Sequence, residues 1–167
     1  MLKKERAAFI SKRLNEIYPE TPVPLNHRDA YQLLVAVLLS AQCTDARVNI
    51  VTPGLFAKAS NAQDMAALKE DEILEAIKSC GLAPKKSRAI KRLSEILMEN
   101  YNGEVPDDFA SLEDLPGVGH KTASVVMSQW FGFPAFPVDT HIHRLAQRWG
   151  LTKNIKIVKA PKETNII

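Results

Sequence analysis

The sequence predicts an all-α protein, built as a bundle of short helices. Apolar residues recur at spacings of three and four, cap-forming residues precede these segments, and glycines follow them. Alternating apolar and polar runs, which are typical of half-buried strands, are scarce. The 167 residues suit one ordinary domain or two small, closely packed ones.

The first expected helix spans about residues 3–18 and has one apolar face. That face consists of Ala7, Ile10, Leu14 and Ile17. Three prolines follow, and then either Asn26 or Asp29 caps a second helix over about residues 31–42. This second helix is apolar on nearly all sides, so we expect it to be the central, buried one.

Caps and glycines also mark the later helices. Thr44 caps a segment in which Pro53 should kink or restart the helix. Another segment opens at Asp71 and should end at Gly81, in the left-handed conformation. Further helices are expected after Asn61, after Pro84, and over residues 107–114, 120–130 and 140–149. The last segment, residues 153–167, has no helical pattern.

The stretch LPGVGHKTASVV, residues 115–126, predicts a tight turn between two helices. Gly117 and Gly119 should adopt backbone angles that other residues resist. Such a turn leaves N–H groups unpaired at a helix N-terminus, which makes a site suited to a DNA phosphate. Backbone donors position a protein on DNA without reading its sequence. The alternative is a plain turn with no ligand.

Lys121 stands in the first turn of the helix that follows, where a cation is disfavoured by roughly 0.3–1 kcal/mol. The positive end of the helix dipole, together with partial burial, lowers the pKa of a lysine and so favours its neutral amine. A nucleophilic, imine-forming lysine needs that form. The alternatives are a solvated surface lysine and a simple phosphate contact.

Asp139 precedes the helix that begins at Thr140. Its plain interpretation is a helix cap, a role that aspartate often fills. The functional interpretation places the carboxylate at the mouth of a cleft. There it would stabilise positive charge on a sugar ring and help to move protons.

Three segments carry a family resemblance, namely LLVAVLLSAQCTD, GEVPDDFASLEDLPGVGHKTASVV and VDTHIHRLAQRWGL. They resemble the endonuclease III family of the helix-hairpin-helix DNA glycosylase superfamily, in collinear order to about Thr152. The resemblance implies a DNA glycosylase fold that is incomplete at its C-terminus. Residues 1–20 would then be a helix of a second lobe, residues 21–139 the helical glycosylase domain with the hairpin, and residues 140–167 a helix and divergent tail left from the second lobe.

The resemblance also implies an activity, that of a bifunctional DNA glycosylase and abasic-site lyase that removes oxidised pyrimidines in base excision repair. Lys121 would form an imine with the deoxyribose, and β-elimination would cut the strand. Asp139 would assist base loss and proton transfer, while Gln42 and Leu82 would fill the space left by the flipped nucleotide. The hairpin residues expected to contact DNA are Pro116, Gly117, Val118, Gly119, His120 and Thr122.

The run PKKSRAIKRL follows Leu82 directly and contains no acidic residue. Its basic residues are Lys85, Lys86, Arg88, Lys91 and Arg92. Phosphate contacts by this run are therefore a prediction, beside the alternative of a solvated helix face.

No metal site or cofactor is expected from this chain. Cys43 and Cys80 lie far apart in sequence and indicate buried thiols in a reducing compartment. His141 and His143 are two residues apart, which places them on different sides of a helix. Relatives usually carry four cysteines that bind a [4Fe–4S] cluster near their C-terminus, and no cysteine follows Cys80 here.

The expected partner is double-stranded DNA with a damaged base or an abasic site, bound by a monomer. A net charge of +3 is compatible with this partner without requiring it. No signal-like or membrane-length apolar run is present, so a cytoplasmic location at the nucleoid is expected, with no membrane partner.

Two other functions stay open. One is a non-catalytic, DNA-binding remnant that keeps only the hairpin. The other is a monofunctional glycosylase, although such relatives usually lack a lysine at the position of Lys121.

Overall fold

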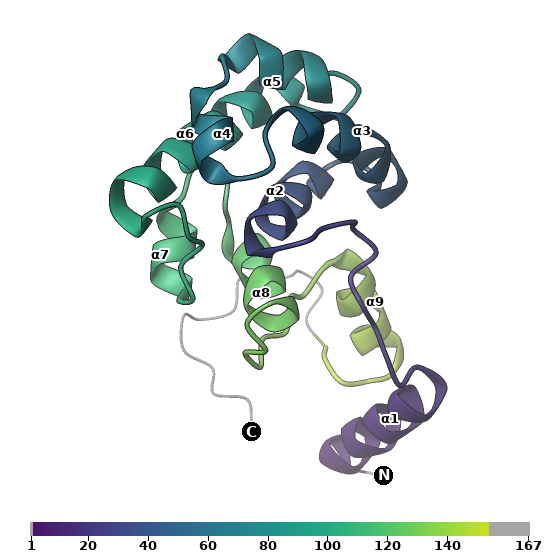
Figure 1. Cartoon of the computed structure of the whole chain (residues 1–167). Coiled ribbons are helices and arrows are strands. Elements are labelled where there is room, and N and C mark those ends of the chain that lie inside the picture. Colours follow the sequence, from purple (N-terminus) through teal and green to yellow (C-terminus); the bar gives the residue numbers. More distant parts are fainter. Residues whose placement is uncertain (1, 154–167) are drawn as a thin grey trace. The chain divides into compact units, whose positions relative to one another are not determined.

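The computed structural model describes residues 2–153, and within that range it contains nine helices and no strand (Figure 1). The predicted all-α class is confirmed. The helices are α1 (Lys3–Ile17), α2 (Ala30–Ser40), α3 (Asp45–Lys58), α4 (Ala62–Ala67), α5 (Glu70–Ile77), α6 (Ala83–Tyr101), α7 (Phe109–Asp114), α8 (His120–Gln129) and α9 (Thr140–Arg148). The segment without helical pattern lies, from residue 154 on, outside the described residues.

The chain divides into two compact units. One comprises residues 22–137 and holds α2 to α8. The other combines residues 1–21 with residues from 138 on, and its described part holds α1 and α9. Assignment of these segments to the lobes of a larger glycosylase stays a prediction.

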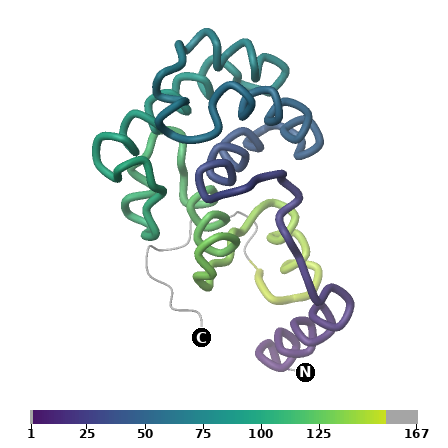
Figure 2. The backbone as a smooth tube through the Cα atoms, in the orientation of Figure 1, coloured from purple at the N-terminus to yellow at the C-terminus, as the bar shows by residue number. Residues whose placement is uncertain are grey.

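Helix α2 is the central helix of the larger unit, as its apolar sequence predicts. Every residue from Tyr31 to Leu39 is buried, and α2 packs against α3, α6 and α8 (Figure 2). Asp29 is its cap, because Asp29 Oδ1 accepts a hydrogen bond of 2.8 Å from the Gln32 N–H. Asn26 instead donates its N–H to Asn49 Oδ1 of α3 at 2.8 Å.

A buried polar contact joins α2 to α6. The hydroxyls of Tyr31 and Ser94 are 2.6 Å apart, and Ser94 also donates to the Ile90 carbonyl at 2.7 Å. Burial raises the pKa of the Tyr31 phenol well above its usual value. Both hydroxyls are therefore satisfied inside the protein core.

We expected a kink or a restart at Pro53. Helix α3 continues through this proline, so the restart is wrong, whereas the kink stays a prediction. Proline removes only one hydrogen bond, the one to the Asn49 carbonyl. Val48 precedes the proline and Leu55 follows it, and both are fully buried. Burial of both halves holds the helix together across the missing bond.

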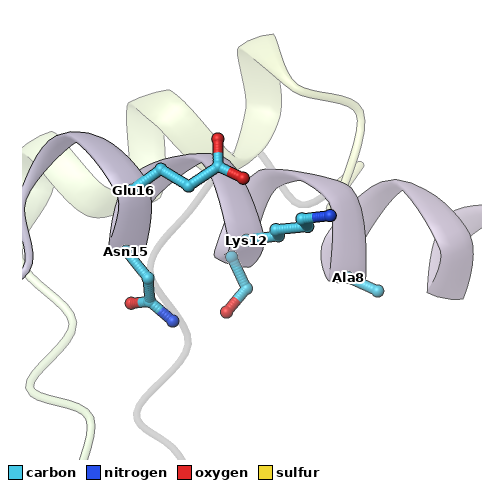
Figure 3. Close-up of a pocket in the computed structure, with 5 residues that line it drawn as sticks. Ala8, Lys12, Asn15 and Glu16 are labelled. Carbon is cyan, nitrogen blue, oxygen red and sulfur yellow. The ribbon is translucent and has the colours of Figure 1, made fainter.

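The smaller unit buries none of the residues of α1 and α9. Arg6 links its two helical segments, since Arg6 Nη1 donates to the carbonyls of Trp149 at 3.2 Å and Gly150 at 3.4 Å. Figure 3 shows a shallow hollow whose lining residues all come from α1, so it is an open helix face. Within residues 2–153, no helix is long and apolar enough to cross a membrane.

Helices α7 and α8 are joined by a tight turn, residues 115–119, which we call the hairpin. The Val118 N–H donates to the Leu115 carbonyl at 3.1 Å and closes this turn. Gly117 has a φ of +79°, the left-handed region that favours glycine. A Cβ atom there would lie 2.9 Å from Ala89 Cβ of α6 and 3.0 Å from Leu38 Cδ1 of α2. Gly117 therefore lets the hairpin pack directly onto the core.

We predict that Gly117→Ala lowers the free energy of unfolding by about 2–4 kcal/mol, through backbone strain and overpacking. Gly54→Ala is the matched control, because Gly54 lies inside α3 and a Cβ there meets no atom within 4 Å. That control should raise stability by about 0.5–1 kcal/mol. Urea unfolding followed by circular dichroism measures both, and equal effects would contradict the packing role of Gly117.

Candidate functional site

The N-terminus of α8 presents a row of unpaired backbone donors. Its cap residue is Gly119, which has no side chain to accept a hydrogen bond. Within residues 2–153, no acceptor faces the N–H groups of Gly119, His120, Lys121 and Thr122. These donors and the helix dipole together suit an anion such as phosphate.

Gly119 differs from the conformation that the sequence predicted for it. Its φ is −97°, which any residue can adopt, so only Gly117 of the two hairpin glycines is left-handed. A Cβ atom at position 119 would meet nothing within 4 Å. The open space beside Gly119 leaves the donors accessible to a bulky ligand.

Val118 and His120, two residues that were expected to contact DNA, make contacts within the protein, and their DNA contacts stay predictions. The Val118 side chain is only 6% exposed, and its N–H bonds to Leu115, so neither group is available to an anion. His120 Nδ1 lies 2.7 Å from Glu113 Oε1, and its ring stacks on Phe109 with centroids 5.6 Å apart. His120 can therefore offer its backbone N–H, while its side chain braces α8 against α7.

Sequence reasoning missed Phe109 and Glu113, the α7 side chains that hold the His120 ring. A signal for them exists, because residues four apart on a helix share one face. Their pairing with His120 across the hairpin required the three-dimensional structure.

Lys121 is the second residue of α8, and its side chain is exposed. The partial burial that we expected for this lysine is therefore absent. No acidic side chain pairs with it in the described part of the chain. Lys121 thus combines an exposed side chain with a place in the same helical turn as the N–H groups that lack an acceptor within residues 2–153.

Gln42 and Leu82 lie on two segments that touch. A Cβ atom at position 81 would lie 2.6 Å from the Gln42 carbonyl oxygen, so only glycine permits this contact. Gln42 and Leu82 have φ values of 54° and 61°, which are uncommon for residues with side chains. Gly81 is not the left-handed residue that we predicted, because Leu82 adopts that conformation and Gly81 serves the close contact. Both Gln42 and Leu82 are exposed.

The basic run after Leu82 does not form one free cationic face. Lys86 is only 5% exposed, and its Nζ donates to the Leu39 carbonyl at the end of α2 at 2.8 Å. Burial lowers the pKa of this lysine below its usual value. The predicted phosphate contact by Lys86 is therefore excluded by its inward orientation.

Three other residues of the run are paired with glutamates. Arg88 pairs with Glu70 at 3.5 Å, Lys91 with Glu95 at 3.5 Å, and Arg92 with Glu95 and Glu99 at 3.1 Å. Lys85 is exposed and has no such partner in residues 2–153. The run itself contains no acidic residue, but glutamates of α5 and of the later turns of α6 pair with its basic side chains.

Asp139 is the cap of α9, because its Oδ1 accepts a hydrogen bond of 2.8 Å from the Ile142 N–H. The plain interpretation of this residue is thus confirmed. Asp139 belongs to the smaller unit and Lys121 to the larger one. Its catalytic interpretation stays a prediction.

Residues 2–153 contain no group of three or more histidine, cysteine or acidic side chains that could hold a metal ion. Cys43 and Cys80 are both free thiols, with Cys80 buried and Cys43 half-buried. The expectation that this chain binds no iron–sulfur cluster stays a prediction.

Residues 35–166 match the family model described as HhH-GPD superfamily base excision DNA repair protein. Endonuclease III of Bacillus subtilis (strain 168) is 44% identical over 153 residues, which cover 92% of this chain and 70% of the relative. Endonuclease III of Escherichia coli (strain K12) is also 44% identical, over 147 residues that cover 88% of this chain and 70% of the relative.

Solved structures show the same likeness. A trapped covalent intermediate of endonuclease III with DNA matches with a TM-score of 0.84 and 45% identity, over 90% of this chain and 70% of that one. A thermostable thymine-DNA glycosylase matches with a TM-score of 0.75 and 29% identity, over 86% of this chain and 67% of that one.

Proposed function

Because the chain belongs to the endonuclease III family of the HhH-GPD base excision DNA repair superfamily, we propose that it is a bifunctional DNA glycosylase and abasic-site lyase. Its substrate would be double-stranded DNA that carries an oxidised pyrimidine, bound by a monomer. One observation carries the proposal, namely four N–H groups at the start of α8 that have no acceptor within residues 2–153, together with the exposed side chain of Lys121 in the same turn.

The hairpin would bind the DNA backbone. The unpaired N–H groups at the start of α8 and the dipole of this helix attract a phosphate oxygen, and Gly119 leaves room for the phosphate. Contacts of this kind carry no base information. The hairpin would therefore fix the register of the strand, so that one nucleotide lies near Lys121.

Lys121 Nζ would then act as the nucleophile. The neutral amine attacks C1′ of the damaged nucleotide, the base leaves, and the sugar is held as an imine. Loss of a proton from C2′ and of the 3′ phosphate completes the β-elimination. The trapped DNA intermediate of the endonuclease III relative supports this course, because that complex is covalent.

Gln42 and Leu82 would occupy the space that the flipped nucleotide vacates. Extrusion of a base from the stack takes a few kcal/mol, and less for a damaged base. The backbone contact between Gln42 and Gly81 holds together the two segments that carry these exposed side chains. Strained, non-glycine left-handed residues are typical of functional sites.

Asp139 would stabilise the positive charge that develops on the sugar and help to move protons. A cap through Oδ1 is compatible with this role, since a capping carboxylate is held in one orientation.

A second candidate is a DNA-binding chain without catalysis. The observation in its favour is that α1 and α9 bury no residue, which leaves the unit that carries Asp139 weakly supported. The two candidates share the hairpin and differ in covalent chemistry.

We predict that borohydride traps the wild-type chain on abasic-site DNA and that Lys121→Ala forms no adduct, because the imine nitrogen is then missing. Lys78→Ala is the matched control, since Lys78 is also an exposed lysine. Denaturing gels measure the adduct. DNA binding without any wild-type adduct would favour the non-catalytic candidate, and an undiminished adduct of Lys121→Ala would assign the imine to another amine.

We predict that Asp139→Asn slows base release from duplex DNA containing an oxidised thymine by about 100-fold. Asparagine caps helices as well as aspartate, so the melting temperature and DNA affinity should stay nearly constant. Single-turnover base release and fluorescence anisotropy separate the two effects. Parallel losses of affinity and folding would leave Asp139 with its capping role alone.

We predict that Lys85→Ala reduces the slope of log affinity against log salt by about 0.9, as expected for one lost phosphate contact. Arg92→Ala should leave the slope unchanged, because Glu95 and Glu99 already hold this side chain. Anisotropy titrations over a range of salt concentrations provide both slopes. If Arg92→Ala reduced the slope and Lys85→Ala left it unchanged, the face of α6 that carries Arg92 would be the DNA-binding surface instead.

A further inference from the structure

We propose that Cys43 and Cys80 are a redox-active pair that forms an intrachain disulfide across the contact between Gln42 and Gly81. Each cysteine is the immediate neighbour in sequence of one residue of that contact. The formation of this bond does not depend on the proposed function, whereas its consequence for DNA does.

Two turns bring the cysteines together. The Cys43 N–H donates to the Ser40 carbonyl at 3.1 Å, and the Cys80 N–H donates to the Ile77 carbonyl at 2.8 Å. The chains of these turns approach so closely that a Cβ at position 81 would lie 2.6 Å from the Gln42 carbonyl oxygen. The Cys43 thiol also acts on the Cys80 thiol and raises its pKa, as a neighbouring thiol does. The close approach of the neighbouring residues Gln42 and Gly81 is the geometric basis for a disulfide between the two cysteines.

The two thiols differ in their surroundings. Cys80 is buried. Its burial, and to a smaller extent the neighbouring Cys43 thiol, raise the pKa of the Cys80 thiol to about 11. Cys43 is half-buried and therefore open to a small reagent. The charges of Lys86 and Arg47 act in the opposite direction on Cys80 and favour its thiolate. We infer that Cys43 reacts first and that Cys80 resolves the product.

The oxidant in this scheme is a low-molecular-weight disulfide. The Cys43 thiolate attacks one of its sulfurs, a mixed disulfide forms, and the first small thiol leaves. Cys80 then attacks the Cys43 sulfur and releases the second small thiol. The cysteine pair loses two electrons and two protons, and the small disulfide gains them.

The bond would tie together the segments that present Gln42 and Leu82. In the reduced chain these side chains already lie on touching segments, so the bond fixes an existing arrangement. If the proposed function holds, preorganisation of this kind should keep or increase affinity for abasic-site DNA.

The test treats the full native chain with oxidised glutathione, blocks free thiols with iodoacetamide, and measures the mass. The expected product lacks two hydrogens, takes up no iodoacetamide, and yields one non-reduced peptide pair that contains both cysteines. Dithiothreitol should reverse all three properties. Three results would overturn the proposal. They are a stable glutathione adduct, a disulfide between two chains, and the reaction of both cysteines with iodoacetamide after the oxidation step, which would show that both thiols had stayed free.

Cys43→Ser and Cys80→Ser are the matched variants, and neither can lose two hydrogens within one chain. Cys80→Ser should accumulate the glutathione adduct on Cys43, whereas Cys43→Ser should react at least tenfold more slowly, because Cys80 is buried. The mass of the oxidised wild-type chain tests the disulfide even if one of the variants folds poorly. If the chain binds abasic-site DNA in neither redox state, the proposed function is refuted. The mass measurement still decides whether the disulfide forms.

Discussion

The last turn of α2 is the constraint on which both candidate surfaces of the larger unit depend. Leu38 lies against Gly117 of the hairpin, and the next residue, Leu39, accepts the hydrogen bond of the buried Lys86. Gln42 follows two residues after the end of α2 and touches the chain at Gly81. One buried helix end therefore positions the hairpin, Gln42 and the start of α6. A shift of this turn would move the predicted phosphate site and the Gln42–Leu82 pair together.

Charge is distributed in a way that gives backbone donors the larger role. Most of the basic residues of α6 are paired with glutamates or, in the case of Lys86, turned inward. Within the described residues, the N–H groups from Gly119 to Thr122 stay unpaired, and Lys85 remains exposed. A small net charge of +3 is thus compatible with a DNA-binding protein whose contacts are few and directed.

Local patterns predicted the helices, the buried position of α2 and the capping roles of Asp29 and Asp139, because each depends on residues close in sequence. They also predicted a left-handed glycine in the hairpin, which is Gly117. The inward turn of Lys86 depends on a carbonyl 47 residues away, and the need for Gly81 depends on Gln42. Such long-range contacts leave no periodic signal in the sequence. The resemblance to a known family named Gln42 and Leu82, whereas the structure supplied the reason that their segments touch.

The central claim is that the amides at the start of α8 bind a DNA phosphate. Backbone amide chemical shifts, followed by NMR during titration with an abasic-site duplex, test it most directly. The account predicts the largest changes at Gly119, His120, Lys121 and Thr122, with smaller ones at Gln42 and Leu82. Changes confined to the paired residues of α6, around Arg92, with none in the hairpin, would contradict it.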